Sequence, residues 1–332
     1  MNATLALLTV GLAASNAAAQ PMLIPPAGPV KPSDRFASAV TLSARNTPGD
    51  ADSVFRITAP GSYVLSGNLR VPSGQTGIEI ASDNVTIDLQ GFTIFGAGVD
   101  DPWSVGIGPQ DREDGEVEFR NFLVRNGSIS DLETAIDLLR EAAPESSAFS
   151  AVRNARVESL RITNVERGVE LRVASSVKDC TIAADLLGVS APFSNVTGCV
   201  IEIADDSGVG IWASGGNVSG CAVSLGPNAH EAIGIDAVNG AVRECVITLL
   251  DTDQIGIDVQ RALVAGSLVV TDEESGIGIR AEDSHLVDCV VSGVEIGFQL
   301  DGDDGLVRNC SALRTEDAIE STSGAVLIDN AF

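Results

Sequence analysis

Two aspartates recur at matching positions of a repeated tripeptide, and their type and spacing suit several chemistries. The tripeptide G-I-D that ends at Asp236 returns 22 residues later, where it ends at Asp258. Paired carboxylates can hold a calcium ion, or they can divide the acid and base roles in glycoside hydrolysis. Asp236 and Asp258 are therefore the first candidate site residues.

Equivalent positions of the neighbouring repeats carry an aromatic and a basic residue. Trp212 stands one repeat before Asp236, and Arg280 stands one repeat after Asp258. An indole ring offers a large apolar surface for stacking, and a guanidinium pairs well with a carboxylate. The loops before these tripeptides are acidic and contain one of the two histidines. The candidate catalytic residues are Asp236, Asp258 and Arg280, the candidate substrate-binding residues are Trp212 and His230, and the candidate calcium ligands are Asp236, Asp258 and Asp253.

The positions of these residues follow an internal repeat. A signature of Gly or Ala, Ile or Val, any residue and an apolar or small residue recurs along the chain, and from Gly168 its spacings are 20, 22, 24, 22, 22, 19 and 21 residues. Each period is β-branched and holds two or three short alternating segments, too short for paired helices. We predict an all-β fold, a right-handed parallel β-helix (solenoid) of about eleven rungs stacked ~4.8 Å apart.

Strand alternation predicts which side chains of this repeat face solvent. In the segment G-I-D-V the isoleucine and valine point inward, and the aspartate between them points outward. One outward column should therefore run along the rod. Its predicted members are Glu79, Gly108, Asp137, Glu170, Ser190, Trp212, Asp236, Asp258, Arg280, Gln299 and Glu320.

This column has three alternative interpretations, which the sequence leaves open. An outward column on an acidic solenoid is polar by default, so it fits a solvated surface on which Arg280 neutralises part of the aspartate charge. It also fits a calcium site without catalysis, and it fits a catalytic cleft. Only two histidines occur in the chain, so histidine chemistry has little support.

The six cysteines share one slot of a second repeated signature, which reads V-R-E-C-V-I from residue 242. Stacked side chains keep their Cβ atoms ~4.8 Å apart, whereas a disulfide favours ~3.8 Å. No C-x-x-C pair offers a zinc site. We expect a reduced, buried structural column, with strained disulfides or a metal site as alternatives. Its members are Cys180, Cys199, Cys221, Cys245, Cys289 and Cys310.

Two segments carry a resemblance to a known family. DNVTIDLQGFTIFG (83–96) and the repeated G-[IV]-x-[IV]…V-x-x-C-x-[IV] frame resemble secreted bacterial β-helix repeat proteins of the pectin-lyase-like superfamily. NTPGDADSVFRITAPGSYVLSGNL (46–69) resembles the entry segment of an uncharacterised branch of that group. The resemblance covers about residues 46–332 and is specific for the fold rather than for an activity.

The resemblance also has implications for the site. In this superfamily the strand that carries the outward column lines the substrate cleft, and the corner occupied here by cysteines carries an asparagine ladder. In its lyases, calcium acidifies the proton next to a uronate carboxylate and an arginine abstracts that proton. Arg280 matches that arginine by position rather than by motif. The hydrolase set N-x-D, D-D, G-H-G, R-x-K and the lyase motif W-x-D-H are absent from the chain.

Composition and the chain ends limit the partners and the location. The chain has 46 acidic and 20 basic residues and a formal charge of -26, which disfavours nucleic acid and anionic membranes as partners. Residues 1–19 read as a signal peptide, residues 20–50 as a Pro-rich linker or entry segment, and residues 51–332 as the β-helix domain. No stretch is long and apolar enough to insert into a membrane. A secreted, periplasmic or cell-surface location is expected.

The function expected from these features is that of an extracellular β-helix repeat protein, a non-catalytic surface or binding rod that binds calcium or carbohydrate. The alternative is a calcium-dependent polysaccharide lyase or glycoside hydrolase that acts on an acidic polysaccharide. Calcium is the one cofactor that these residues suggest, and an extracellular polysaccharide is the expected partner. The final segment AVLIDNAF shows no evident cap, so we expect either a short covering strand or end-to-end homo-oligomers.

Overall fold

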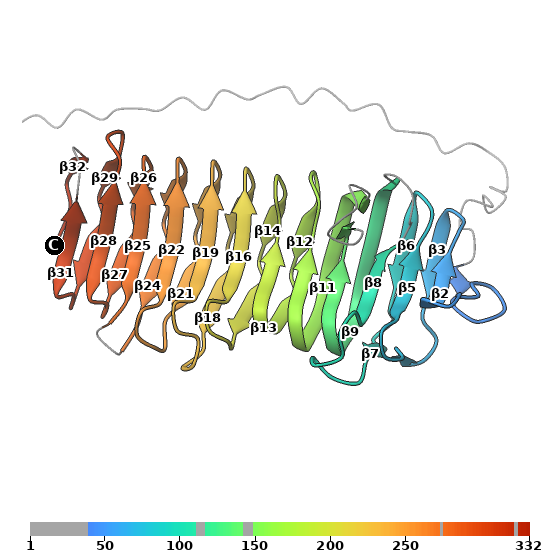
Figure 1. Cartoon of the computed structure of the whole chain (residues 1–332). Coiled ribbons are helices and arrows are strands. Elements are labelled where there is room, and N and C mark those ends of the chain that lie inside the picture. Colours follow the sequence, from blue (N-terminus) through green and yellow to red (C-terminus); the bar gives the residue numbers. More distant parts are fainter. Residues whose placement is uncertain (1–38, 111–116, 142–148, 273–274, 322–324) are drawn as a thin grey trace, which may run out of the picture. The chain divides into compact units, whose positions relative to one another are not determined.

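The computed structural model of the chain is an all-β parallel solenoid of about 12 turns (Figure 1). The structure describes residues 39–110, 117–141, 149–272, 275–321 and 325–332. These residues form strands, turns and bends but no helix, so none of them forms a helix able to span a membrane. The expected fold class is confirmed. The additional turn comes from β2 (Ser53–Ile57), which pairs with β5 although it lacks the repeated tripeptide.

Each turn contributes one strand to each of three faces, which we call A, B and C. Face A carries the outward column. It consists of β2, β5 (Thr76–Ile80), β8 (Val105–Pro109), the last residues of β9 (Val117–Asp137), β11 (Phe149–Glu170) and β13 (Thr181–Ser190), and then β16 (Val209–Ser214), β19 (Ile233–Val238), β22 (Ile255–Gln260), β25 (Ile277–Glu282), β28 (Ile296–Asp301) and β31 (Asp317–Ser321).

Faces B and C complete each turn with shorter strands. Face B consists of β1 (Val40–Thr41), β3 (Gly61–Val64), β6 (Val85–Asp88), the first parts of β9 and β11, β12 (Ser176–Lys178), β14 (Asn195–Thr197), β17 (Asn217–Ser219), β20 (Ala241–Arg243), β23 (Leu263–Ala265), β26 (His285–Val287), β29 (Leu306–Arg308) and β32 (Val326–Ile328). Face C consists of β4 (Leu69–Arg70), β7 (Thr93–Phe95), the middle parts of β9 and β11, the start of β13, β15 (Val200–Ile203), β18 (Ala222–Leu225), β21 (Val246–Thr248), β24 (Leu268–Val270), β27 (Val290–Ser292) and β30 (Ser311–Leu313).

The repeated glycine of face A is required by close packing inside the coil. A Cβ added to Gly234 would lie 2.5 Å from the carbonyl oxygen of Gly256 and 2.7 Å from Ile247 Cγ2 on face C. The isoleucine that follows the glycine, such as Ile235, is fully buried. The next residue must then point outward, because side chains alternate along a strand. The packing of the core therefore fixes the positions of Asp236 and its equivalents.

The six cysteines line the corner between faces B and C, and all are free and buried. The column is interrupted at Ser267, whose hydroxyl accepts a hydrogen bond from the backbone N–H of Cys245 at 3.3 Å. At its end, Asn330 Oδ1 accepts a hydrogen bond from the Cys310 N–H at 2.8 Å. Hydrogen bonding to neighbouring thiols, together with burial, raises the pKa of Cys199 and Cys245. The same hydrogen bonds lower the pKa of Cys180 and Cys221, so the direction of the shift alternates along this part of the column. The structural role, as expected, rests on the burial of all six free thiols.

The solenoid begins before the boundary expected at residue 51. Strand β1 pairs in parallel with Tyr63 and Val64 of β3, and residues 38–332 form one compact unit. The last part of the expected linker, 20–50, is therefore included in the coil. The predicted signal peptide, 1–19, lies outside the described residues. The segment 130–141 forms the end of β9, a bend at Leu138 and β10 (Leu139–Glu141).

The C-terminal residues fold back onto the last turn. Ala331 forms a parallel bridge with Ser311, and the ring of Phe332 packs edge-on against Phe298 with centroids 5.9 Å apart. Val326 and Leu327 of β32 nevertheless remain about half exposed, at 55% and 49%. The expected cover is thus present as a short segment. Association between copies of the chain stays a prediction.

Candidate functional site

The strand register of face A confirms the predicted outward column from Trp212 to Arg280, whereas Glu79, a predicted member nearer the start of the solenoid, is buried and pairs with Arg56. Trp212 pairs with Asp236, Asp236 with Asp258, and Asp258 with Arg280 on consecutive turns β16, β19, β22 and β25. The Trp212 side chain is 38% exposed, and the three charged side chains are partly buried. Four of the predicted site residues therefore stand side by side on one flat surface.

Arg280 is already engaged by one of the two aspartates. Its Nη2 donates a hydrogen bond to Asp258 Oδ2, and the two side chains are 37% and 24% exposed. The hydrogen bond that Arg280 donates to Asp258, with the charges of Asp258 and Asp236, raises the pKa of the arginine despite its partial burial. The guanidinium therefore stays protonated, and Asp258 has a permanent counter-charge.

Asp236, unlike Asp258, has no cationic side chain paired with it in the described part of the chain. Burial raises its pKa, the charge of Asp258 raises it further, and Arg280 offsets only part of this effect. Among the described residues, no side chain forms a hydrogen bond or ion pair with its carboxyl group. The two stacked aspartates are consequently inequivalent, because Asp236 takes up a proton more readily than an ordinary aspartate does.

A shallow groove of about 440 Å³ lies over these residues. The column forms one wall of the groove, and the residues of the opposite wall do not appear among those predicted from the sequence. Strand alternation places another outward residue two positions after each column residue. These residues are Val238, Gln260, Glu282 and Asp301, and they line the groove beside Asp236, Asp258 and Arg280. Gln260 Nε2 donates a hydrogen bond to Glu282 Oε2 at 2.8 Å. The same period-2 rule that located the first column could have located this wall.

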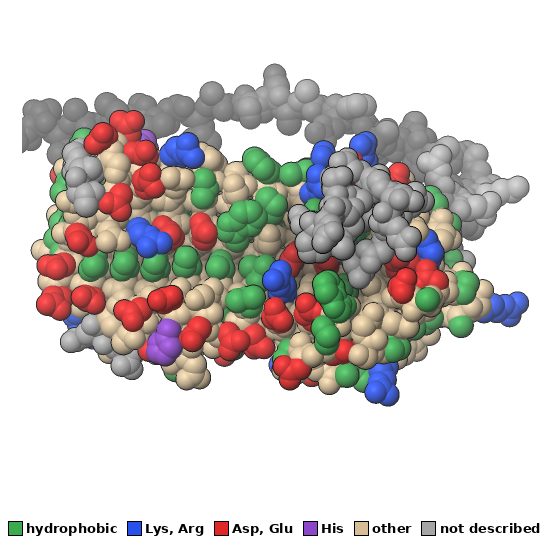
Figure 2. Space-filling view, in the orientation of Figure 1, with side chains coloured by type: hydrophobic (Ala, Val, Ile, Leu, Met, Phe, Trp, Pro, Cys, Tyr) green, Lys and Arg blue, Asp and Glu red, His purple; other side chains and the backbone are tan. Residues whose placement is uncertain are grey.

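A row of outward isoleucines runs along the other side of the column. Ile233, Ile255, Ile277 and Ile296 stand at the start of their strands and line a second depression of about 460 Å³. Glu231, Asp253 and Glu295 form its acidic rim, and Arg280 lines it as well as the groove. Figure 2 shows acidic side chains on both sides of a hydrophobic row on this face of the molecule.

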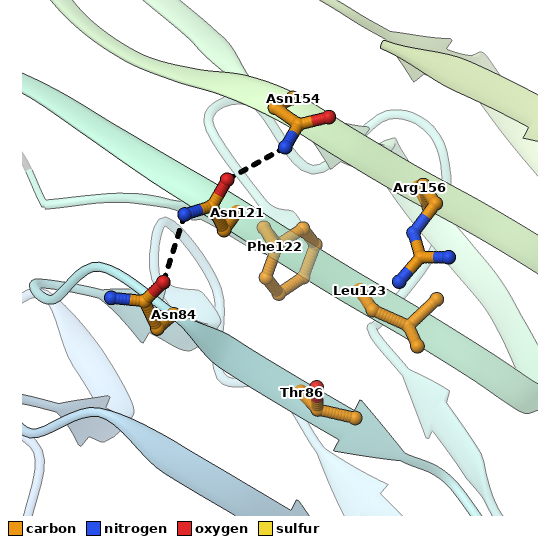
Figure 3. Close-up of a pocket in the computed structure, with 7 residues that line it drawn as sticks. All are labelled: Asn84, Thr86, Asn121, Phe122, Leu123, Asn154 and Arg156. Atoms are coloured by element: carbon orange, nitrogen blue, oxygen red, sulfur yellow. Dashed lines mark hydrogen bonds between the residues drawn. The ribbon is translucent and has the colours of Figure 1, made fainter.

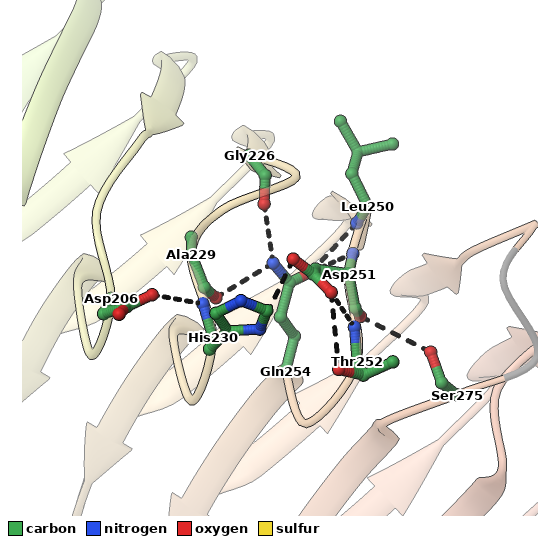
Figure 4. Close-up of polar contacts among 9 residues, drawn as sticks. All are labelled: Asp206, Gly226, Ala229, His230, Leu250, Asp251, Thr252, Gln254 and Ser275. Atoms are coloured by element: carbon green, nitrogen blue, oxygen red, sulfur yellow. Dashed lines mark hydrogen bonds and ion pairs between the residues drawn. The ribbon is translucent and has the colours of Figure 1, made fainter.

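The structure places His230 in the loops that precede face A rather than in the groove (Figure 4). Its Nδ1 lies 3.4 Å from Asp251 Oδ2, and its backbone N–H donates a hydrogen bond to Asp206 Oδ1 at 3.0 Å. Gln254, which the sequence reasoning did not single out, is fully buried and fixes two of these loops. Its Nε2 donates to the carbonyls of Gly226 and Ala229, and its Oε1 accepts from two backbone N–H groups of the next loop.

The residues do not fit a calcium ion well. Calcium takes six to eight oxygen ligands, but no group of three or more Asp, Glu, His or Cys side chains could share a metal ion in the described part of the chain. Asp253 lines the second depression rather than the groove of Asp236 and Asp258. The guanidinium of Arg280 would also repel a divalent cation. Calcium binding by these three aspartates stays a prediction, and no chemical step is derived through it.

A further depression, of about 430 Å³, lies on face B at an asparagine ladder (Figure 3). Asn121 Nδ2 donates to Asn84 Oδ1 at 2.8 Å, and Asn154 Nδ2 donates to Asn121 Oδ1 at 2.6 Å. Thr86 and Arg156 project from the same strands as the ladder. The ladder lies at the corner between faces A and B, whereas the resemblance implied one at the cysteine corner.

The register and the column together define a parallel β-solenoid protein with a polar groove along one face. No family model and no curated protein matches the sequence. The catalytic unit of a thermostable GH87 alpha-1,3-glucanase from Streptomyces thermodiastaticus strain HF3-3 is similar in structure, with a TM-score of 0.49, 14% identity, and coverage of 89% of this chain and 69% of that one.

Two further solved structures are similar. One is the surface adhesin PfbA of Streptococcus pneumoniae, with a TM-score of 0.48, 8% identity, and coverage of 89% of this chain and 93% of that one. The other is the A-module of the mannuronan C-5 epimerase AlgE4 from Azotobacter vinelandii, with a TM-score of 0.38, 13% identity, and coverage of 82% and 86%. The solenoid assignment rests on this chain's own strand register.

Proposed function

We propose that this protein is an extracellular glycan-binding rod whose site is the groove over Asp236, Asp258 and Arg280, with Trp212 at one end. The observation that carries the proposal is the register that stacks an exposed indole ring, two carboxylates and a guanidinium on four consecutive turns. An open groove along a flat face suits an extended polymer, whereas small molecules are usually held in enclosed pockets.

The charge of the groove narrows the class of glycan. Four carboxylates, those of Asp236, Asp258, Glu282 and Asp301, line it with the single guanidinium of Arg280. The formal charge of the whole chain is -26. Such a surface repels a uronate polymer and attracts hydroxyl or ammonium groups. The proposed ligand is therefore a neutral or amine-bearing glycan, in place of the acidic polysaccharide expected from the sequence.

The lyase alternative has weak chemical support. An arginine that abstracts a proton must first lose its own, and a general base works best when its pKa lies near the operating pH. The hydrogen bond to Asp258 moves the pKa of Arg280 further upward instead. This arginine thus suits a charge-pairing role.

Hydrolysis is the second candidate function, because the two aspartates differ in the manner that acid and base roles require. Asp236 has a raised pKa, whereas Asp258 is paired with Arg280. Two carboxyl groups in different environments can divide the acid and base roles of a glycosidase. In this scheme Asp236 would protonate the departing glycosidic oxygen, and Asp258 would attack the anomeric carbon or activate water.

Binding calorimetry with four soluble polymers tests the proposal: laminarin and xylan as neutral glycans, glycol chitosan as an amine-bearing one, and polygalacturonate as an acidic one. We expect saturable binding of at least one of the first three, at least tenfold weaker binding in Trp212→Ala, and no binding of polygalacturonate. Binding by none of the first three, or equal binding by the variant, would refute the proposal. Release of reducing ends that is lost in Asp258→Asn would favour hydrolysis over binding alone.

A further inference from the structure

One residue at the corner between faces A and B carries an exposed aromatic side chain. The corner residue three positions after each column residue has a positive φ whatever its type, at Gly215 (φ 68°), Asn239 (54°), Arg261 (51°), Asp283 (47°) and Gly302 (84°). On the turn before Trp212 this position is Phe193, with φ 50°. The left-handed backbone is thus a property of this corner, and what distinguishes Phe193 is its aromatic side chain.

Burial does not explain the phenylalanine, because its side chain is 62% exposed. Its backbone is instead fixed by the neighbouring turns. The Phe193 N–H donates to the carbonyl of Ser214 at 2.7 Å, and its own carbonyl accepts from the Ala174 N–H at 3.1 Å. The corner residues of the following turns make the same backbone hydrogen bond, for example Asn239 N–H to the carbonyl of Gln260, so the exposed ring is what sets Phe193 apart.

The ring of Phe193 rests on the corner glycine of the next turn. A Cβ added to Gly215 would lie 2.5 Å from both Cδ1 and Cε1 of the ring. The absence of a side chain at Gly215 therefore gives the ring a defined seat while its remaining surface stays open to solvent.

This seat places Phe193 close to the groove. Gly215 follows Trp212 by three residues, about 10 Å along an extended strand. Ser214, which lies between them, pairs in register with the groove residue Val238, just as Trp212 pairs with Asp236. Trp212 therefore stands on the turn next to the groove, and the ring of Phe193 rests against the corner glycine of that same turn.

We propose that Phe193 and Trp212 form a two-ring platform that binds the sugar units at this end of the groove. The inference rests on the proposed glycan-binding function and adds Phe193 as a residue that contacts the ligand. The apolar C–H faces of pyranose rings pack on aromatic rings, and the carboxylates of Asp236 and Asp258 accept hydrogen bonds from hydroxyl or ammonium groups of the adjoining sugar. The neutral rings of the platform and the acidic groove together select a neutral or amine-bearing glycan.

The experiment uses the full chain and Trp212 as its own reporter. Trp103 is the only other tryptophan in the sequence, and it is 69% exposed on a loop before β8, several turns from the groove. In a Trp103→Phe background, titration with laminarin, xylan and glycol chitosan should change the emission of Trp212. Phe193→Asn, which copies the residue at Asn239, should then weaken binding at least tenfold without lowering the melting temperature, and Phe193→Tyr should retain binding.

The outcomes separate this inference from the proposed function. Unchanged binding in Phe193→Asn together with lost binding in Trp212→Ala would overturn the platform and leave the glycan site intact. If Phe193→Asn lowers the melting temperature and weakens binding, and Phe193→Tyr restores neither, the ring has a structural role. This result would also overturn the inference. Absence of binding by the unmodified protein to all three glycans would overturn both proposals. If Trp103→Phe alone weakens glycan binding as much as Phe193→Asn does, exposed aromatic rings contribute to binding wherever they lie. The platform beside the groove would then be overturned.

Discussion

Arg280 and Asp258 occupy the same strand position on adjacent turns, and Arg280 Nη2 donates a hydrogen bond to Asp258 Oδ2. Asp236 stands on the turn beyond Asp258, at the same position again. One guanidinium therefore pairs with only one of two stacked carboxylates. This asymmetry determines the protonation of Asp236, the response of the groove to cations, and the sign of the charge that a ligand meets there.

Removal of the guanidinium should increase the affinity of the groove for calcium. In Arg280→Ala the carboxylates of Asp258 and Asp236 lose their cation, and a divalent ion becomes the available counter-charge. We expect calorimetry to detect weak or no saturable calcium binding in the unmodified protein and tighter binding in Arg280→Ala. Loss of the partly buried ion pair should lower the free energy of unfolding by about 1 kcal/mol or less.

Asp236→Asn and Asp258→Asn variants provide the control for the calcium experiment. Each removes one carboxylate without changing the shape of the side chain, so each should abolish any gain produced by Arg280→Ala. Micromolar calcium binding by the unmodified protein that disappears in these variants would instead establish the aspartate site predicted from the sequence.

Because its pKa is raised, Asp236 should contribute more to the stability of the folded protein in mild acid than at neutral pH. Burial first, and the charge of Asp258 second, raise this pKa above the ordinary value of 3.8. The folded state then binds the proton more tightly than the unfolded state does. Its contribution to stability is fully present below the unfolded pKa, and it is lost as the pH rises through the folded pKa.

Replacement of this carboxyl by an amide isolates the effect. Asp236→Asn cannot ionise, so at pH 7 it should melt at a higher temperature than the unmodified protein. The difference should shrink as the pH falls and vanish below about pH 4, where an ordinary aspartate also becomes protonated. Melting temperatures measured between these pH values check the prediction. A lower melting temperature of Asp236→Asn at pH 7 would mean that the charged carboxylate stabilises the fold.

The column of Asp236, Asp258 and Arg280 could be predicted from the sequence because a solenoid repeats its geometry at every turn. A buried glycine and isoleucine fix the direction of the next side chain, and the spacing of about 22 residues fixes its neighbour. The second wall of the groove, which includes Gln260 and Glu282, follows from the same alternation. These relations depend on local periodicity alone.

Features that depend on the corners and loops were not visible in the repeat. The seat of Phe193 depends on a left-handed backbone and on the missing side chain of Gly215 one turn away. Gln254 fixes loops of unequal length through contacts across 25 and 28 residues. His230 was grouped with the site because it precedes Asp236 in the chain, but the loop turns its side chain toward Asp251. Sequence proximity is a poor guide where the chain leaves the regular strands.

The stacked thiols should be inaccessible in the folded protein. All six cysteines are buried. Hydrogen bonds between neighbouring thiols raise the pKa of Cys199, Cys245 and Cys289 and lower that of Cys180, Cys221 and Cys310, so burial is what protects the column. Because all six side chains are buried, a thiol reagent such as DTNB cannot reach them in the folded state, and it should modify less than one cysteine per native chain and all six after denaturation. The intact mass should not change on reduction. Fast native labelling, or a mass gain of two protons per pair on reduction, would contradict this assignment.

The glycine column should be the part of the site scaffold that tolerates substitution least. In Gly234→Ala the new methyl group would lie 2.5 Å from the Gly256 carbonyl oxygen and 2.7 Å from Ile247 Cγ2, so either the strand or the core must move. Overpacking of this kind costs about 1–3 kcal/mol, and chemical denaturation should show that loss. Gly67→Ala is the matched control, because its added Cβ meets no atom within 4 Å, and its unfolding free energy should change by no more than about 0.5 kcal/mol.

Since Gly234 is two residues before Asp236, its replacement should also weaken binding in the groove, whereas the control should leave binding unchanged. Equal stability of the two variants would show that the coil can widen locally, and the packing of the core would then not be what fixes the outward direction of Asp236.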